Sequence, residues 1–385
     1  MSKQNVDTVC DTVKQSEGIK QKSESADGSI AETLRRRGVS RRDFLKFCSA
    51  MTAAMALPAS FAPRVAQALE ESKKPTLVWL EMQSCTGDSE ALLRSANPTV
   101  AELILDILSV DYHETIMAAA GHQAEEALDK TIAAFKGKYI CVVEGSIAMK
   151  DGGIYGSTGG KSHVDRARQV CGGALATIAV GTCASYGGIA AALPNPTGAV
   201  GVQEAVPGVT VINLPGCPVN ADNLTATIVH YLVFGKIPAL DSKGRPLFAY
   251  GKRIHDNCER RPHFDAGQYV EKWGDEGHRK GFCLYKMGCK GPATFHNCPT
   301  QRYNEKTSWP VAAGHPCAGC SEPQFWDAMG PMYKRLTNVP GFGIEQSADK
   351  IGLGMAVGVG AAFAAHGLVS SLRKDKDPAE ETKEV

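Results

Sequence analysis

The sequence lacks an excess of charge of either sign, because 42 Lys and Arg are balanced by 41 Asp and Glu in 385 residues. The formal net charge of +1 does not indicate the excess of positive charge that attracts a polyanion, so we expect no binding to nucleic acid. No Gly-x-Gly-x-x-Gly follows the first predicted strand, 76–80, which argues against a dinucleotide site. The sequence also shows no serine–histidine pair, paired carboxylates or phosphate loop in a convincing context. We therefore expect no substrate pocket of these types.

The first 68 residues have the features of an export signal. A polar leader is followed by Ser40-Arg41-Arg42-x-Phe44-Leu45-Lys46, an apolar run, 47–62, and an Ala66-Gln67-Ala68 cleavage site. This order is typical of a signal peptide, and the paired arginines resemble the bacterial twin-arginine signal, whose route exports folded proteins. A basic surface helix is the alternative. We expect residues 1–68 to be removed together with Cys10 and Cys48, which leaves eleven of the thirteen cysteines.

Apolar runs alternate with helical patterns between residues 74 and 250. Four runs have the composition of strands buried in a parallel sheet, namely 76–80, 139–143, 177–180 and 209–214. Asn97-Pro98 and Asn220 are N-cap signals, each followed by apolar residues at helical spacing. This alternation predicts an α/β domain with a doubly wound parallel sheet over 74–250.

The turns after the four predicted strands carry residues with metal chemistry. In chain order they hold Cys85 and Asp88, Glu144, Cys183, and Cys217. Parallel strands point their carboxyl ends at one edge, where open α/β sheets bind ligands, so we expect these side chains to meet there. Core cysteines belong inside apolar segments instead, and we interpret Cys141 and Cys171 in that way.

A second set of possible ligands occupies a stretch without apolar periodicity. It consists of His255, Cys258, Cys283, Cys289, Cys298, Cys317 and Cys320. Thiolates select zinc, copper or iron–sulfur clusters, and bound metal supplies folding free energy where a core cannot. The C-x-x-C spacing at Cys317 suits zinc as well as iron–sulfur clusters, so the spacing does not decide between these two kinds of metal site. We expect an irregular, metal-held domain over 251–345.

The C-terminal part contains a long apolar run. Residues 351–372 have no acidic or basic member other than His366, and basic residues follow. At about 1.5 Å per residue the run roughly covers the 30 Å hydrocarbon layer. It predicts a transmembrane helix over 351–372 and a charged cytoplasmic tail, 373–385, because positive charge favours the inner side. A buried core helix is the alternative. His366 either faces a partner helix or lies near a haem of a cytochrome subunit.

Five motifs in order give the chain a resemblance to a known family. They are Trp79-Leu80 before Cys85-Thr86-Gly87, Val143-Glu144-Gly145-Ser146-Ile147, GTCASYGG at 181–188, Leu214-Pro215-Gly216-Cys217-Pro218, and WPVAAGHPCAGC at 309–320. Over essentially the whole mature chain they resemble the small subunit of nickel-iron hydrogenases. The resemblance implies a flavodoxin-like doubly wound domain, an irregular iron–sulfur cluster domain and a C-terminal transmembrane helix. It also implies a role in electron transfer, with hydrogen split on a separate large subunit.

The resemblance assigns three ligand sets. Cys85, Asp88, Cys183 and Cys217 would hold a proximal 4Fe-4S cluster; His255, Cys258, Cys283 and Cys289 a distal 4Fe-4S cluster; Cys298, Cys317 and Cys320 a medial 3Fe-4S cluster. Pro310 stands where the medial cluster would otherwise have a fourth cysteine. Glu144 would lie beside the proximal cluster, either as an acceptor for backbone amides or near the subunit interface.

The first motif departs from the family pattern, which is usually Cys-Thr-Gly-Cys. Asp88 stands at the last position, and it either ligates the cluster or leaves one site open. We expect ligation, because a carboxylate places a negative ligand at the same spacing. Oxygen-tolerant members carry two additional cysteines at positions that match Gly87 and Gly188, so their unusual cluster is not expected.

The resemblance places the protein on the periplasmic side of the cell inner membrane, exported by the twin-arginine route. Its partners would be the nickel-iron large subunit, in a heterodimer able to dimerise further, and a membrane cytochrome b or similar quinone-linked subunit. Two alternatives stay open. One is a cluster subunit similar to that of respiratory complex I, against which the second and third cluster motifs, the export signal and the tail count. The other is a zinc-stabilised periplasmic scaffold without electron transfer.

Overall fold

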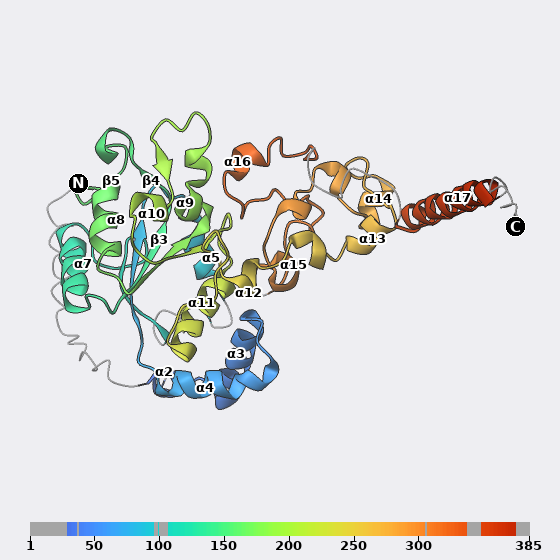
Figure 1. The fold of residues 1–385 in the computed structure, drawn as a ribbon. Coiled ribbons are helices and arrows are strands. Elements are labelled where there is room, and N and C mark those ends of the chain that lie inside the picture. The colour runs from blue at the N-terminus through green and yellow to red at the C-terminus, as the bar shows by residue number, and fades with distance from the viewer. Residues whose placement is uncertain are drawn as a thin grey trace, which may run out of the picture.

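The computed structural model describes residues 29–36, 38–95, 99, 107–304, 306–336 and 348–374. A sheet domain, an irregular domain and a protruding helix follow one another along the chain (Figure 1).

Five parallel strands form the central sheet in the order β2-β1-β3-β7-β9. Their bounds are β1 Thr76–Glu81, β2 Ser109–His113, β3 Ile140–Glu144, β7 Ala176–Val180 and β9 Val211–Leu214. Four of them confirm the predicted apolar runs, with ends shifted by one or two residues. The prediction missed β2, an edge strand whose sequence, SVDYH, has little apolar character.

Side chains alternate across the sheet and build a core on each face. Trp79 and Val142 belong to the core that packs against helix α11, Ala221–Phe234. The other core includes Val143 and packs against α7, His122–Ala134, and α8, His163–Cys171. Figure 1 shows these helices on opposite sides of the strands.

Cys141 and Cys171 lie in the second core, as predicted, and are 0% and 2% exposed. The predicted cap at Asn220 is also confirmed, because its side chain accepts a hydrogen bond from the backbone N–H of Asp222 at the start of α11. Most of the helix predicted after Asn97 lies outside the described residues.

Short elements connect the strands and lead to the second domain. In the sheet domain they are α5 Gly87–Leu93, β4 Ile147–Ala148, η4 Lys150–Gly153, β5 Ser157–Thr158, β6 Lys161–Ser162, α9 Gly181–Tyr186, η5 Gly188–Ala191, β8 Ala199–Val200, α10 Val202–Ala205 and α12 Leu247–Tyr250. Two small antiparallel pairs, β4 with β8 and β5 with β6, accompany the main sheet.

The irregular domain contains only very short helical elements among its described residues. They are η6 Ile254–Asn257, α13 Arg261–Asp265, α14 Glu276–Arg279, η7 Tyr285–Met287, η8 Gly291–Ala293, α15 Cys298–Gln301 and α16 Phe325–Ala328. Its two small clusters of buried apolar residues include three of the predicted ligands, Cys283 in one and Cys298 and Cys317 in the other, and Cys258 and Cys289 pack against the latter. The apolar core of this part of the chain is therefore small.

The segment predicted to be an export leader packs against the sheet domain. Its elements are α2 Ile30–Arg36, α3 Arg41–Ala54, η2 Ala59–Phe61 and α4 Ala62–Glu71. Phe47 and Met51 of α3 are buried in the same core as residues of α11. Figure 1 shows these helices beside the lower end of α11. Removal of this segment stays a prediction.

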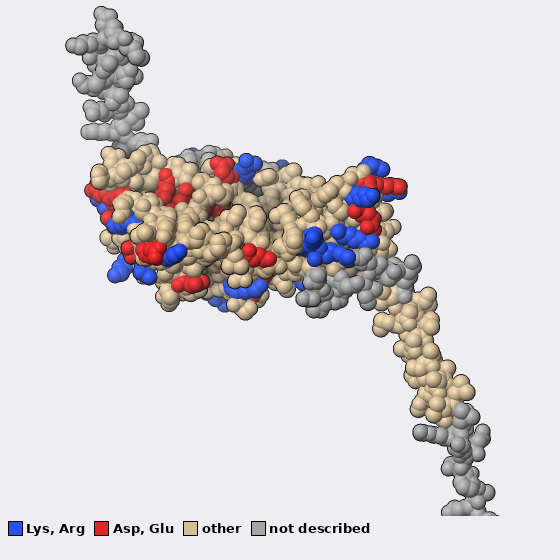
Figure 2. Space-filling model, turned by 90° about the horizontal axis from the view of Figure 1, so that it is seen from above, with Lys and Arg blue, Asp and Glu red and all other residues tan. Residues whose placement is uncertain are grey.

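The chain ends in helix α17, Ala348–Lys374. Its stretch Ile351–Ser371 is the one helix among the described residues that is long and apolar enough to cross a membrane, and none of it is buried. Figure 2 shows it as a protrusion without Lys, Arg, Asp or Glu. The helix lies where the sequence predicted it, and residues 375–385 of the predicted tail lie outside the described part.

Candidate metal centres

The sheet brings together the four residues of the proximal set, Cys85, Asp88, Cys183 and Cys217. Each follows the carboxyl end of a strand, β1, β7 or β9. Burial raises the pKa of Cys183 to about 11, and the nearby charges of Asp88 and Cys85 act in the same direction. Cys217 opens to a cavity, but burial of its thiol raises its pKa to about 12, with smaller contributions from Cys320 and Cys183.

These pKa values describe a donor set that suits bound iron. Burial, and to a smaller extent the neighbouring negative charges, disfavours the ionised thiols, and a bound cation would keep them ionised. The proximal set thus fits a metal cluster both by position and by charge.

Asp88 is 7% exposed and lies at the start of α5. Its Oδ1 atom accepts a hydrogen bond of 2.6 Å from the backbone N–H of Val219. Burial, followed by the charge of Glu144, raises its pKa to about 7. A Cβ atom at Gly181 would lie 2.1 Å from Oδ2, so only glycine leaves room for the carboxylate. The structure therefore places Asp88 within the predicted set.

Glu144 is 1% exposed at the end of β3, and all its hydrogen-bond partners are donors. They are Trp79 Nε1 at 3.2 Å, Ser84 Oγ at 2.8 Å, the backbone N–H groups of Asp88 and Ser89 at 3.0 and 3.1 Å, and Ser89 Oγ at 2.6 Å. The residue accepts the first amides of α5, which is one of the two roles that the sequence predicted. A position near a subunit interface stays a prediction.

The two glycines that match additional cysteines in oxygen-tolerant relatives have little free space. A Cβ atom at Gly188, where φ is +56°, would lie 2.4 Å from Cys183 Sγ. A Cβ atom at Gly87 would lie 3.1 Å from Cys85 Sγ. A cysteine at Gly188 would thus need a backbone shift, since an L-residue also strains at this φ.

All three residues of the medial set, Cys298, Cys317 and Cys320, line one cavity of about 940 Å³. Pro310 and Cys217 also lie on its wall, as do Phe47 and Met51 of α3. Burial raises the pKa of each medial thiol. The cavity therefore lies between the medial and proximal sets, and Pro310 borders it as the resemblance implies.

The four residues of the distal set, His255, Cys258, Cys283 and Cys289, line a second, small cavity. Burial lowers the pKa of His255 to about 4, so its imidazole is neutral near pH 7 and has a lone pair for a metal. Burial raises the pKa of Cys258 to about 11 and that of Cys283 to about 12. The distal set thus shares the properties of the proximal set.

Zinc and iron–sulfur clusters differ in the ligand arrangement that they need. Within the part of the chain that the structure describes, no group of three or more His, Cys, Asp or Glu side chains could hold a metal ion. A structural zinc site needs four ligands around one ion, whereas a cluster presents a separate iron atom to each ligand. The twelve described cysteines are also all free, which excludes a disulfide framework among them.

Sequence reasoning missed three buried polar residues between these sets. Thr182, Arg245 and Lys290 are 2%, 3% and 1% exposed. Thr182 directly precedes Cys183, and Lys290 directly follows Cys289. This adjacency to a predicted ligand is the only sequence signal that could have indicated them. Arg245 has no such signal.

Two family profiles match the chain in succession. The NADH ubiquinone oxidoreductase 20 kDa subunit family matches residues 85–231, and the C-terminal family of NiFe/NiFeSe hydrogenase small subunits matches residues 250–333. The second match covers the medial and distal sets. It disfavours the alternative of a complex I subunit, which shares only the first domain.

Individual relatives match this chain in sequence over nearly their full length. The uptake hydrogenase small subunit of Azotobacter vinelandii is 50% identical over 343 residues, 89% of this chain and 96% of that protein. The quinone-reactive Ni/Fe-hydrogenase small chain of Wolinella succinogenes is 47% identical over 352 residues, 89% and 99% of the two chains. A solved structure of the Ni-Fe-Se hydrogenase from Desulfomicrobium baculatum has a TM-score of 0.64 at 33% identity and covers 69% of this chain and 100% of its own. The chain therefore belongs to the family of nickel-iron hydrogenase small subunits.

Proposed function

We propose that this chain is the electron-transfer subunit of a respiratory uptake hydrogenase. It passes electrons from hydrogen oxidation on the large subunit through three iron–sulfur clusters to a membrane cytochrome b and quinone. The observation that carries the proposal is the grouping of eleven predicted ligands into three sets, at one sheet edge and around two cavities. The names of the relatives, uptake and quinone-reactive hydrogenase subunits, point the same way.

The proposed cofactors are two 4Fe-4S clusters and one 3Fe-4S cluster. The proximal cluster belongs to a flavodoxin-like, doubly wound domain over 74–250, which the strand order supports. The medial and distal clusters belong to the irregular domain over 251–345, and the small core of that domain supports a stabilising role for bound clusters.

The clusters would supply one-electron chemistry, and the protein residues would hold and insulate them. Thiolates of the proximal and medial sets would bind iron, with Cys298 and Cys317 at buried positions and Cys85 and Cys217 at exposed ones. The neutral imidazole of His255 would replace a thiolate in the distal set, which removes a negative charge and would raise the potential there. A higher potential at this end would favour the arrival of electrons at the distal set.

The partners follow from the two ends of this route. The large subunit with its nickel-iron site would contact the proximal side, in a heterodimer able to dimerise further. Helix α17 would anchor the chain in the cell inner membrane beside the cytochrome, and its exposed apolar surface supports this. Export by the twin-arginine route would place both domains in the periplasm. His366 would face a partner helix or a haem of the cytochrome.

Purification of the complex from membranes, with nickel, iron, zinc and acid-labile sulfide quantified, tests the proposal. We expect a tightly bound large subunit that contains nickel. We also expect about eleven cluster iron atoms per small subunit, four for each 4Fe-4S and three for the 3Fe-4S cluster, in addition to the iron of the nickel-iron site. Zinc without iron or brown colour would support the scaffold alternative instead and contradict the proposal.

A further inference from the structure

The medial set lies close to both of its neighbours. The backbone N–H of Cys317 donates to Cys289 Sγ at 3.4 Å, which links the medial and distal sets. On the proximal side, Cys217 and Cys320 line the same cavity. The backbone N–H of Cys217 acts to lower the pKa of the Cys320 thiol, against the larger effect of burial, which raises it.

Thr182 lies at the proximal–medial junction, immediately before Cys183, and is buried. Its hydroxyl donates to the backbone carbonyl of Cys320 and accepts from the backbone N–H of Gly216 at 3.0 Å. Its own N–H donates to the carbonyl of Gly216 at 2.9 Å. Since Gly216 precedes Cys217, one side chain connects the segments of three ligands.

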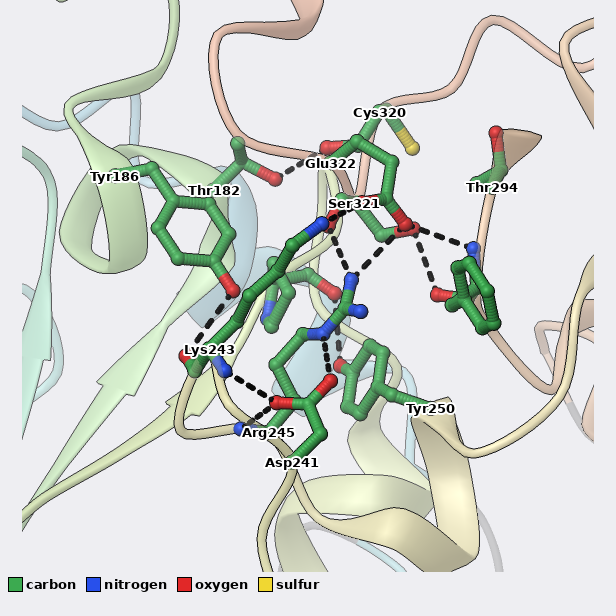
Figure 3. A network of polar contacts seen from close by, with 12 residues as sticks. Thr182, Tyr186, Asp241, Lys243, Arg245, Tyr250, Thr294, Cys320, Ser321 and Glu322 are labelled. Atoms are coloured by element: carbon green, nitrogen blue, oxygen red, sulfur yellow. Dashed lines mark hydrogen bonds and ion pairs between the residues drawn. The ribbon is translucent and has the colours of Figure 1, made fainter. Parts of the chain in front are cut away.

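The other side of the medial loop is held by a buried ion pair. Arg245 Nη1 donates to Glu322 Oε1 at 2.9 Å and to the carbonyl of Ser321 at 3.3 Å. Lys243 Nζ donates to Glu322 Oε2 at 2.6 Å. Figure 3 shows this network below Cys320, with the Thr182 hydroxyl directed at the Cys320 carbonyl from the left. The ion pair fixes the loop that follows Cys320, and Thr182 joins Cys320 directly to the turns of Cys183 and Cys217.

We propose that Thr182 is a positioning residue for electron transfer between the proximal and medial sets. Its hydroxyl bridges the carbonyl of Cys320 and the N–H of Gly216, next to Cys217, and this hydrogen-bonded path is the through-bond route, because electronic coupling falls more steeply across a gap than along bonds. In each transfer one electron leaves the proximal cluster, which is oxidised, and one electron reduces the medial cluster, with no proton moved. This inference rests on the proposed function.

The test uses the complete membrane-purified complex with Thr182→Val, which removes the hydroxyl at nearly constant volume, and Thr182→Ser, which keeps it. Thr227→Val is the matched control, because Thr227 is equally buried and loses only a hydrogen bond of 2.7 Å within α11. Hydrogen–deuterium exchange of the Gly216 amide is expected to accelerate about five- to tenfold in Thr182→Val, the equilibrium weight of one intramolecular hydrogen bond. Thr182→Ser and Thr227→Val should leave it unchanged.

The second readout is electron paramagnetic resonance of the reduced complex. We expect a smaller splitting of the proximal signal by the medial cluster in Thr182→Val, recovery in Thr182→Ser, and unchanged midpoint potentials of both clusters in all variants. Wild-type splitting and wild-type amide exchange in Thr182→Val would overturn the inference.

Two further outcomes are decisive. If Thr182→Val loses iron, Thr182→Ala takes its place, and loss of iron from both overturns the inference because Thr182 would then act in cluster assembly. If the wild-type complex itself shows no cluster signals, the proposed function fails as well. Failure of the inference alone is thus recognised by intact cluster signals in the wild-type complex.

Discussion

The Asp88 carboxylate accepts its 2.6 Å hydrogen bond from Val219, two residues beyond Cys217. One carboxylate therefore connects α5, which begins beside Cys85, with the turn after β9. Oδ1 is occupied by this contact, so Oδ2 is the atom available to iron. The contact separates two possible roles of Asp88, as an iron ligand and as a support for the Cys217 turn.

Substitution of Asp88 separates the two roles. If Asp88 is a ligand, Asp88→Ala should lower the iron content from about eleven to about seven atoms per small subunit, the loss of one four-iron cluster. Asp88→Cys should retain the cluster, because it restores the thiolate of the usual family motif. Asp88→Asn keeps an acceptor for Val219 but removes the negative charge, so retention of the cluster in Asp88→Asn and Asp88→Ala would contradict ligation. Iron analysis and low-temperature spectra measure each outcome.

Glu144 makes five hydrogen bonds as an acceptor, and its replacement by glutamine should be costly. The amide NH₂ of Gln would face donors, which leaves buried N–H groups without an acceptor. We expect Glu144→Gln to lower the free energy of unfolding by about 3 kcal/mol, since hydrogen bonds to charged groups contribute about 1.5–3 kcal/mol each. Thermal unfolding of the purified complex measures this loss.

Glu126→Gln on α7 is the control for that experiment. Glu126 forms only an exposed ion pair with Lys130, so its loss should change stability by less than about 0.5 kcal/mol. Equal unfolding midpoints of the Glu144 and Glu126 variants would contradict the structural role of Glu144.

The position of the proximal residues at one sheet edge could be predicted because it depends on local sequence order. Strand ends follow from apolar runs, and parallel strands share an edge, so the sequence alone predicts Cys183 and Cys217 at the same edge. The role of Thr182 depends instead on Cys320, which lies 138 positions further along the chain. The sequence does not predict strand β2, because an edge strand needs fewer apolar residues than a central one and its pattern is therefore weak.

Glu114 gives a pH-dependent prediction away from the predicted ligands. Burial raises its pKa from 4.5 to about 7. The folded state therefore holds a proton that the unfolded state releases, and stability from this group falls as the pH rises from about 4.5 to 7. Glu114→Gln cannot ionise, so the difference in melting temperature, variant minus wild type, should increase over this window and then stay constant. A difference independent of pH would contradict the shift.

The predicted cleavage site lies within helix α4, and this gives the last prediction. Leu69, the first residue after Ala68, is 0% exposed in the core shared with α11. A peptidase needs an extended, accessible segment, so α4 must unwind and leave α11 before cleavage. We expect the membrane-purified protein to begin at Leu69, as measured by N-terminal sequencing.

Replacement of the arginine pair should arrest this process. Arg41→Lys with Arg42→Lys keeps the positive charge of α3, whose arginines are exposed, so folding of the precursor should not change. Recognition by the export receptor depends on the arginine pair, and the variant should therefore keep its leader and remain in the cytoplasm. A twin-lysine protein that still begins at Leu69 in the membrane fraction would show that another route exports it. Removal of the leader also uncovers the face of α11 against which Phe47 and Met51 pack, so the mature chain needs a new cover there.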